Sequence, residues 1–194
     1  QVGYLNRAFV VDVHEHHPWD APYRTRGAPR SETDVIALHR LQAWLETAGA
    51  LRKRGKVLRR TERGAAMAED PLLAWGAFTR TVAPEGWDRF VIDDAAQILL
   101  ERRGPVATSD LFGEIAGDAV ELGWRTNDGA FQRPPNEQDV RYAFHTGWAL
   151  LDLFGFAAEH GDWRDRGVSV PPAGESTLLA MLRAVAAGPR SRPW

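Results

Sequence analysis

A short basic stretch holds the residues with the most distinctive chemistry in this sequence. Between positions 52 and 63 there are seven basic residues and one acid, Glu62, whereas the whole chain has a net charge of −2. Guanidinium and ammonium groups neutralise phosphates and acidic side chains, so the stretch predicts a surface for a polyanion or for an acidic protein. The alternative is a solvated segment whose charges pair with the acidic remainder of the chain. The candidate binding residues are Arg52, Lys53, Arg54, Lys56, Arg59, Arg60 and Arg63.

Three histidines near the start of the chain form a second candidate. His14, His16 and His17 lie among carboxylates, and imidazoles with carboxylates can bind zinc or another divalent ion. On a helix His14 and His17 would share a face. The spacing differs from the His-Glu-x-x-His motif of metalloproteases. The alternative is a solvated helix end, where histidine lies near the negative pole of the helix dipole.

Signals for catalysis are weak elsewhere in the chain. Asp93 and Asp94 are adjacent, and neighbouring side chains on a helix point about 100° apart. We therefore expect one of them to be exposed and the other to act as a cap or an ion-pair partner. No Gly-rich phosphate loop, nucleophile elbow or zinc-finger pattern occurs, and no cofactor is predicted. The sequence favours a non-enzymatic binding module, with a metal-dependent protein or enzyme using the histidine cluster as the alternative.

The elements that would position these residues follow from hydrophobic periodicity and from helix-boundary signals. Ser31 and Asp34 form a capping-box pattern ahead of a helix that Gly49 ends. Residues 124–136 are expected to be a connector. Hairpins are predicted from residues 51–54 with 56–60 and from 156–159 with 167–170. Helices are predicted over residues 4–17, 32–48, 87–103, 109–122, 136–154 and 173–187, with shorter ones after Thr61 and Asp70.

The order of these elements is similar in the two halves of the chain. Each half contains a helix, a glycine stop, a short hairpin, a turn and another helix, with Gly64 and Gly174 following the second strand. This order is typical of the back half of a winged-helix domain. We therefore predict a mainly α protein with small β-hairpins, built as tandem winged-helix units over residues 1–83 and 84–194. Trp44, Trp75 and Trp148, together with Trp87, are expected to anchor the core or a domain interface.

The helix ahead of the basic hairpin would be the recognition helix if the protein read a DNA sequence. Its expected exposed positions are net acidic, with one fixed cation, Arg40, and phosphates would repel such a surface. A protein partner is therefore slightly favoured over weak, non-specific nucleic-acid binding through the hairpin. These positions are Glu32, Asp34, Gln42, Glu46 and Thr47.

Roughly the first 80 residues resemble a known family. The motifs are Gly3-Tyr4-Leu5, Asp34-Val35, Leu38-His39-Arg40-Leu41, Ala48-Gly49-Ala50-Leu51-Arg52, Leu58-Arg59-Arg60-Thr61-Glu62-Arg63-Gly64 and Asp70-Pro71-Leu72. They are similar to the C-terminal region of actinobacterial plasmid open-reading-frame-three-like proteins, also described as mobile-element passenger proteins. The activity of that family is not established, so the resemblance implies helix ends, wing strands and caps but no catalytic residues. In that family a separate small domain precedes this region, which makes such a domain a candidate partner.

Composition sets the remaining expectations. The chain has no cysteine, which excludes disulfides and thiol chemistry and fits a reducing compartment. No stretch approaches the roughly 18 apolar residues of a membrane span, and no signal-peptide pattern occurs. We therefore expect a cytoplasmic protein with no membrane partner. The chain begins at Gln1 rather than Met, so we expect it to be a piece of a longer protein.

Overall fold

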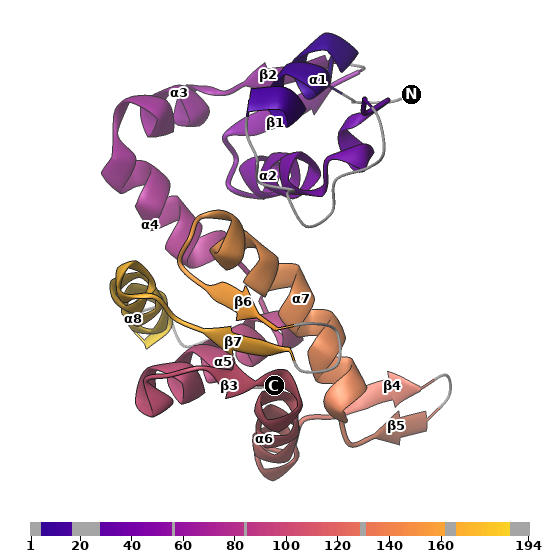
Figure 1. The fold of residues 1–194 in the computed structure, drawn as a ribbon, viewed down its shortest axis with the longest axis vertical. Helices are drawn as coiled ribbons and strands as arrows, with labels where there is room; N and C mark the ends of the chain where they lie inside the picture. The colour runs from indigo at the N-terminus through magenta and orange to yellow at the C-terminus, as the bar shows by residue number, and fades with distance from the viewer. Residues whose placement is uncertain are drawn as a thin grey trace. The chain divides into compact units, whose positions relative to one another are not determined.

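The protein is mainly helical with small antiparallel sheets (Figure 1). The computed structural model describes residues 5–16, 28–55, 57–83, 85–128, 131–161 and 166–186. The chain divides into two compact units, unit 1 at Gln1–Thr81 and unit 2 at Val82–Trp194. Within the described ranges, no helix combines the length and the apolar character that a membrane crossing needs. The predicted class, mainly α with small hairpins, is thus confirmed.

Unit 1 contains short helices and one two-stranded antiparallel sheet. The hairpin and the helices around it were predicted within a few residues, and Thr61 caps α3 by accepting the Gly64 N–H at 3.0 Å. The elements are α1 (Arg7–His16), the 3₁₀ turn η2 (Glu32–Asp34), α2 (Ile36–Thr47), β1 (Leu51–Arg54), β2 (Val57–Arg60), α3 (Glu62–Glu69) and α4 (Pro71–Thr81).

The predicted capping box forms, but it caps a different element. The Asp34 carboxylate accepts the backbone N–H groups of Ser31 at 3.1 Å and Arg30 at 2.8 Å. These bonds close the single 3₁₀ turn η2. Val35 then leaves helical geometry, with φ −116° and ψ 86°, and α2 begins only at the next residue. The predicted continuous helix is therefore broken by one β-branched residue.

A buried apolar cluster packs α1 against the start of α2 in unit 1. Val10 and Val13 of α1 belong to one buried cluster with Val35 and Leu38. The spacing of three residues puts Val10 and Val13 on one face of α1, whereas Val35 precedes the first residue of α2. Burial of such aliphatic groups contributes about 1.5–3 kcal/mol for each side chain.

Tryptophan contributes to this unit at α2 but not at every predicted position. The Trp44 ring lies edge-on to Phe78, with 5.6 Å between centroids, and its indole N–H donates to Thr81 Oγ1 at 3.0 Å. Trp44 is buried, as predicted. Trp75 on α4 was predicted to be a core or interface anchor, but it is 40% exposed within the described chain. The helical face to which it belongs is open, because Leu72 and Leu73 are exposed too.

Unit 2 is built around one long central helix. Its sheets are short, with strands of two or three residues. Its elements are α5 (Trp87–Arg102), β3 (Val106–Ala107), α6 (Thr108–Glu121), β4 (Thr126–Asp128), β5 (Phe131–Arg133), α7 (Glu137–Leu153), β6 (Ala158–His160), β7 (Gly167–Ser169) and α8 (Pro172–Ala186).

The core of unit 2 follows the apolar stripe of α7. Phe144, Trp148 and Leu151 are fully buried, as their spacing of four and three residues predicts. The Phe144 and Trp148 rings stack with 4.8 Å between centroids, and Phe112 of α6 meets Phe144 edge-on at 5.1 Å. Gly147 allows α5 to approach α7, because a Cβ there would lie 2.6 Å from a side-chain carbon of Ile92.

The sheets of unit 2 differ from the prediction in two ways. The predicted second hairpin forms as β6–β7, but β3 adds to β7 and makes a three-stranded antiparallel sheet of order β3-β7-β6 (Figure 1). The predicted connector at 124–136 contains a further hairpin, β4–β5. Both additions were missed because strands of two or three residues are too short to show hydrophobic alternation.

The two predicted glycine stops have the same geometry. Gly49 after α2 has a φ of +73°, and Gly155 after α7 has a φ of +71°. In each case the N–H of the following residue bonds at 2.8 Å to a carbonyl inside the helix, that of Leu45 or Leu151. This is the Schellman arrangement, in which a left-handed residue at the helix end satisfies the last carbonyls. It fixes the direction in which each hairpin leaves its helix.

The helix after each hairpin is also anchored in the same way. A Cβ on Gly64 of α3 would lie 2.1 Å from the carbonyl oxygen of Ala50. A Cβ on Gly174 of α8 would lie 1.9 Å from the carbonyl oxygen of Phe156. In both halves a glycine therefore lets the returning helix contact the backbone at the start of the hairpin. The internal similarity extends from sequence pattern to backbone contact.

Candidate functional site

The basic stretch folds into the β1–β2 hairpin and the first turn of α3. Its register places Arg52 directly opposite Arg59. Because side chains alternate along a strand, Arg54 points to the same side as these two. The half-buried Leu51 and Leu58 belong to the other side. We call the surface formed by Arg52, Arg54 and Arg59 the arginine face.

The arginine face is exposed and carries uncompensated charge. All three arginines are exposed, and none forms an ion pair with another described residue. Like charges directly opposite each other on neighbouring strands destabilise the pair of strands. An anion placed between Arg52 and Arg59 would relieve that repulsion. The arrangement therefore suits a ligand with closely spaced negative charges.

The other predicted basic residues surround this face without belonging to it. Lys53 points to the opposite side of the hairpin, where it forms an ion pair with Glu46 at 3.3 Å. Arg60 is opposite Leu51 in the register and is exposed, and Arg63 is exposed in the first turn of α3. Lys56 lies outside the described residues.

The prediction that Glu32 and Gln42 lie on an exposed acidic surface beside the hairpin is wrong, whereas Asp34 and Glu46 are half-buried and Thr47 is exposed. Glu32 is 1% exposed, and it accepts the backbone N–H of Leu5. Gln42 is 5% exposed, and Glu46 is occupied by Lys53. The burial of Glu32 and Gln42 was not predicted, because charged and amide side chains are expected to be solvent-exposed.

The side of α2 that is exposed carries basic groups instead. His39 and Arg40 are exposed there, together with Ala43 and Thr47. The exposed part of α2 therefore adds one fixed positive charge, that of Arg40, and a histidine. The exposed positions of α2 therefore carry no acidic group, and its half-buried Glu46 pairs with Lys53.

The predicted histidine cluster is not assembled within the described chain. His16 contacts Asp12 one turn earlier, with 3.2 Å between Nδ1 and Oδ1, and both side chains are exposed. His14 is half-buried, and His17 lies outside the described residues. Among the residues that the structure describes, no group of three or more His, Cys, Asp or Glu side chains could hold a metal ion.

The adjacent aspartates of α5 have different environments, and neither is exposed. Asp93 binds the guanidinium of Arg89 with both oxygens at 2.9 Å, which confirms the predicted ion-pair role. Burial raises the pKa of Asp93, and Arg89 partly offsets that rise. Burial, with repulsion from Asp118 as the next cause, raises the pKa of Asp94 to about 6. The prediction that one of the two is exposed is therefore wrong.

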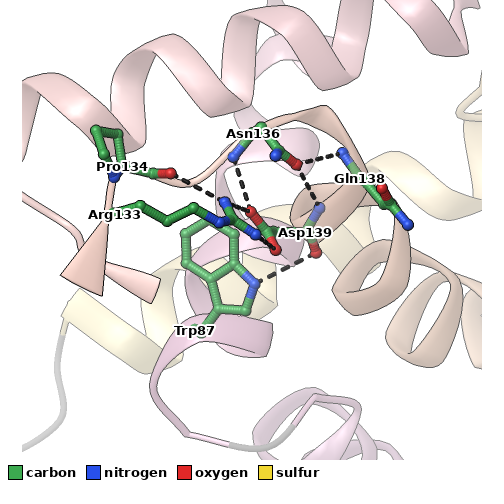
Figure 2. A network of polar contacts seen from close by, with 6 residues as sticks. All are labelled: Trp87, Arg133, Pro134, Asn136, Gln138 and Asp139. Carbon is green, nitrogen blue, oxygen red and sulfur yellow. Dashed lines mark hydrogen bonds and ion pairs between the residues drawn. The ribbon is translucent and has the colours of Figure 1, made fainter. Parts of the chain in front are cut away.

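A polar network fixes the start of α7 and the β4–β5 hairpin (Figure 2). Asn136 caps the helix by accepting the N–H groups of Gln138 at 3.0 Å and Asp139 at 3.2 Å. The Asp139 carboxylate accepts two bonds from the Arg133 guanidinium, at 2.6 and 2.9 Å. These bonds lower the pKa of Asp139. The Trp87 indole N–H points at the Asp139 carbonyl, 3.5 Å away.

This network orients a polar face of α7 that sequence reasoning did not single out. Gln138, Arg141, Tyr142 and Thr146 are exposed along it, and Tyr142 is 68% exposed. The Arg141 guanidinium lies 5.9 Å from the centroid of the Phe112 ring. The signal was present in the sequence, because these positions are opposite the apolar stripe on a 3.6-residue period.

Comparison with known proteins finds no family model that matches the chain, and no significant match among the curated proteins or the solved structures.

Proposed function

We propose that this protein is a non-enzymatic binding module that contacts the phosphates of nucleic acid through its basic hairpin. The observation that carries this proposal is the arginine face, where Arg52 and Arg59 oppose each other in solvent with no acidic partner in the described chain. Arginine forms paired hydrogen bonds with phosphate oxygens, and neighbouring phosphates supply closely spaced negative charge. Phosphate contacts of this kind position a protein without reading sequence.

We further propose that both units are of the winged-helix class. In unit 2 the order is α5, β3, α6, α7, β6 and β7, with the β4–β5 hairpin inserted between α6 and α7, and the sheet order is β3-β7-β6. This order supports a domain of three helices followed by a wing, with α7 as the recognition helix. Unit 1 contains the matching back half, α2, β1, β2 and α3. In this assignment the arginine face lies on the wing of unit 1.

The surroundings of the hairpin favour nucleic acid over an acidic protein. A protein surface presents isolated carboxylates, whereas a nucleic-acid backbone presents a regular row of charges that matches a row of arginines. An acidic protein partner becomes the conclusion if the protein fails to bind nucleic acid.

The decisive experiment is a fluorescence-anisotropy titration with generic duplex DNA over a series of salt concentrations. The test variant combines Arg52→Gln, Arg54→Gln and Arg59→Gln. We expect binding at low salt with a steep salt dependence. For three lost phosphate contacts, the slope of log affinity against log salt should become shallower by about 3, since each contact contributes roughly 0.9.

A matched control separates the arginine face from net charge. Arg7, Arg125 and Arg183 are exposed elsewhere in the chain, and changing all three to Gln removes the same charge. We expect this control to keep nearly the whole slope. An equal loss in both triple variants, or no binding by the unmodified protein, would contradict the proposal.

A further inference from the structure

Unit 2 contains a cavity of about 280 Å³ that no part of the proposed function uses. It is lined by residues from the end of α5, from the β6–β7 hairpin and from the start of α8. Leu99 and Val170 supply apolar lining. Its volume lies just below the range typical of ligand sites, which begins at about 300 Å³. A ligand there must therefore be small.

The cavity is lined by two opposite charges that do not pair with each other. Arg103 lies at the end of α5, and Glu175 lies in the first turn of α8. Neither side chain forms an ion pair with another described residue. Two opposite charges that share a cavity without meeting can both be satisfied by one molecule that carries the complementary pair.

Two further polar groups complete the lining. His160 of β6 and Ser169 of β7 also face the cavity, and they share a hydrogen bond of 2.6 Å between Nε2 and Oγ. A hydroxyl can donate to one acceptor while it accepts from another group. The pair therefore offers a further hydrogen bond to a ligand oxygen and is held in place by the two strands.

The backbone at Arg103 adds an independent observation. Among the described residues, Arg103 alone has a positive φ without being a glycine, with φ 49° and ψ 37°. A side chain makes this left-handed conformation unfavourable, and such residues concentrate at ligand sites. Gly104 follows at once and would accept the conformation more readily. This conformation ends α5, where the Arg103 N–H bonds to the Leu99 carbonyl at 3.1 Å.

We propose that this cavity binds a free α-amino acid with an apolar side chain. The carboxylate would contact Arg103 and the Ser169 hydroxyl, and the ammonium group would contact Glu175. The side chain would lie on Leu99 and Val170. This site does not depend on the nucleic-acid proposal, because it lies in unit 2 and uses none of the hairpin arginines.

The test is calorimetric titration of the full chain with L-leucine and with two analogues that each lack one charge. L-leucinamide keeps the ammonium group and loses the carboxylate, and N-acetyl-L-leucine does the reverse. We expect L-leucine to bind with 1:1 stoichiometry. Each analogue should bind at least about tenfold more weakly, as expected when one charged contact is lost.

Two variants distinguish loss of the site from loss of the fold. Arg103→Gly removes the charge and relieves the backbone strain, so it should raise the melting temperature while L-leucine binding weakens at least about tenfold. Glu175→Gln keeps the shape of the side chain and removes its charge. In this variant L-leucine and N-acetyl-L-leucine should bind with equal affinity. Absence of L-leucine binding by the unmodified chain overturns the proposal. So does unchanged L-leucine affinity in both variants.

Discussion

The pKa of Asp94 makes the stability of unit 2 depend on pH in a direction that can be worked out. One carboxylate oxygen of Asp94 is buried, with no hydrogen-bond partner among the described residues. Burial and the neighbouring acids Asp118, Glu114 and Glu101 raise its pKa from 3.8 to about 6. Between these two pH values the folded state holds a proton that the unfolded state has released. The free energy of unfolding therefore falls as the pH rises from about 4 to about 6, and stays lower above that range.

The size of this effect follows from the shift. At about 1.36 kcal/mol for each pH unit, a rise from 3.8 to about 6 corresponds to about 3 kcal/mol. The side chain is only half-buried, so solvent screening reduces the expected penalty to about 1 kcal/mol. Asp94→Asn removes the charge and keeps the shape. We expect the variant to be about 1 kcal/mol more stable than the unmodified protein above pH 6 and equally stable below pH 4.

The assay is urea unfolding between pH 4 and pH 8, followed by hydrogen exchange of the α5 and α7 amides so that unit 2 is measured by itself. Asp118→Asn serves as a graded comparison. It removes the largest charge repulsion but leaves Asp94 buried, so its gain above pH 6 should be smaller. A stability difference that is the same at every pH would refute the reasoning, because it would show that Asn changes packing and not ionisation.

Two further predictions concern backbone contact and the start of α7. Gly64→Ala should destabilise unit 1 by about 3 kcal/mol in thermal unfolding, because the added Cβ meets a backbone carbonyl, and Gly174→Ala should do the same in unit 2. Gly117→Ala, where a Cβ meets nothing within 4 Å, should instead stabilise by about 1 kcal/mol. Arg133→Gln should raise the pKa of Asp139 toward its ordinary value in an NMR titration. The substitution should lower the free energy of unfolding by about 0.5 kcal/mol above pH 4, and this loss should disappear as Asp139 becomes protonated in the folded state. An unchanged pKa of Asp139 would exclude the guanidinium as the cause of its lowering.

Much of the helical framework could be predicted because its signals are local. The apolar stripe of α7, the Asn136 cap and the glycine at position 155 are all visible within one stretch of sequence. The β3 strand could not be predicted in the same way. It has two residues, and it exists because it adds to β7, some sixty residues later. Pairing over that separation leaves no local pattern.

The candidate sites were predictable in composition and not in arrangement. The charge count identifies the hairpin arginines, but only the strand register shows that Arg52 faces Arg59. Buried Glu32 had no sequence signal, since its partner is a backbone N–H from a distant segment. The cavity of unit 2 was missed entirely, because Arg103 and His160 come from separate elements.

The exposed β1–β2 hairpin also makes the protein susceptible to cleavage by trypsin. Trypsin cleaves after arginine and lysine, and β1 and β2 present Arg52, Lys53, Arg54, Arg59 and Arg60 in a two-stranded sheet that is short and open to solvent. Short hairpins with mutually repelling charges open locally at low free-energy cost. Any anion that bridges the arginines would close the hairpin and slow its cleavage. The rate of the first tryptic cleavage therefore reports whether an anion occupies the arginine face. It can be measured in a crude extract before any ligand is known.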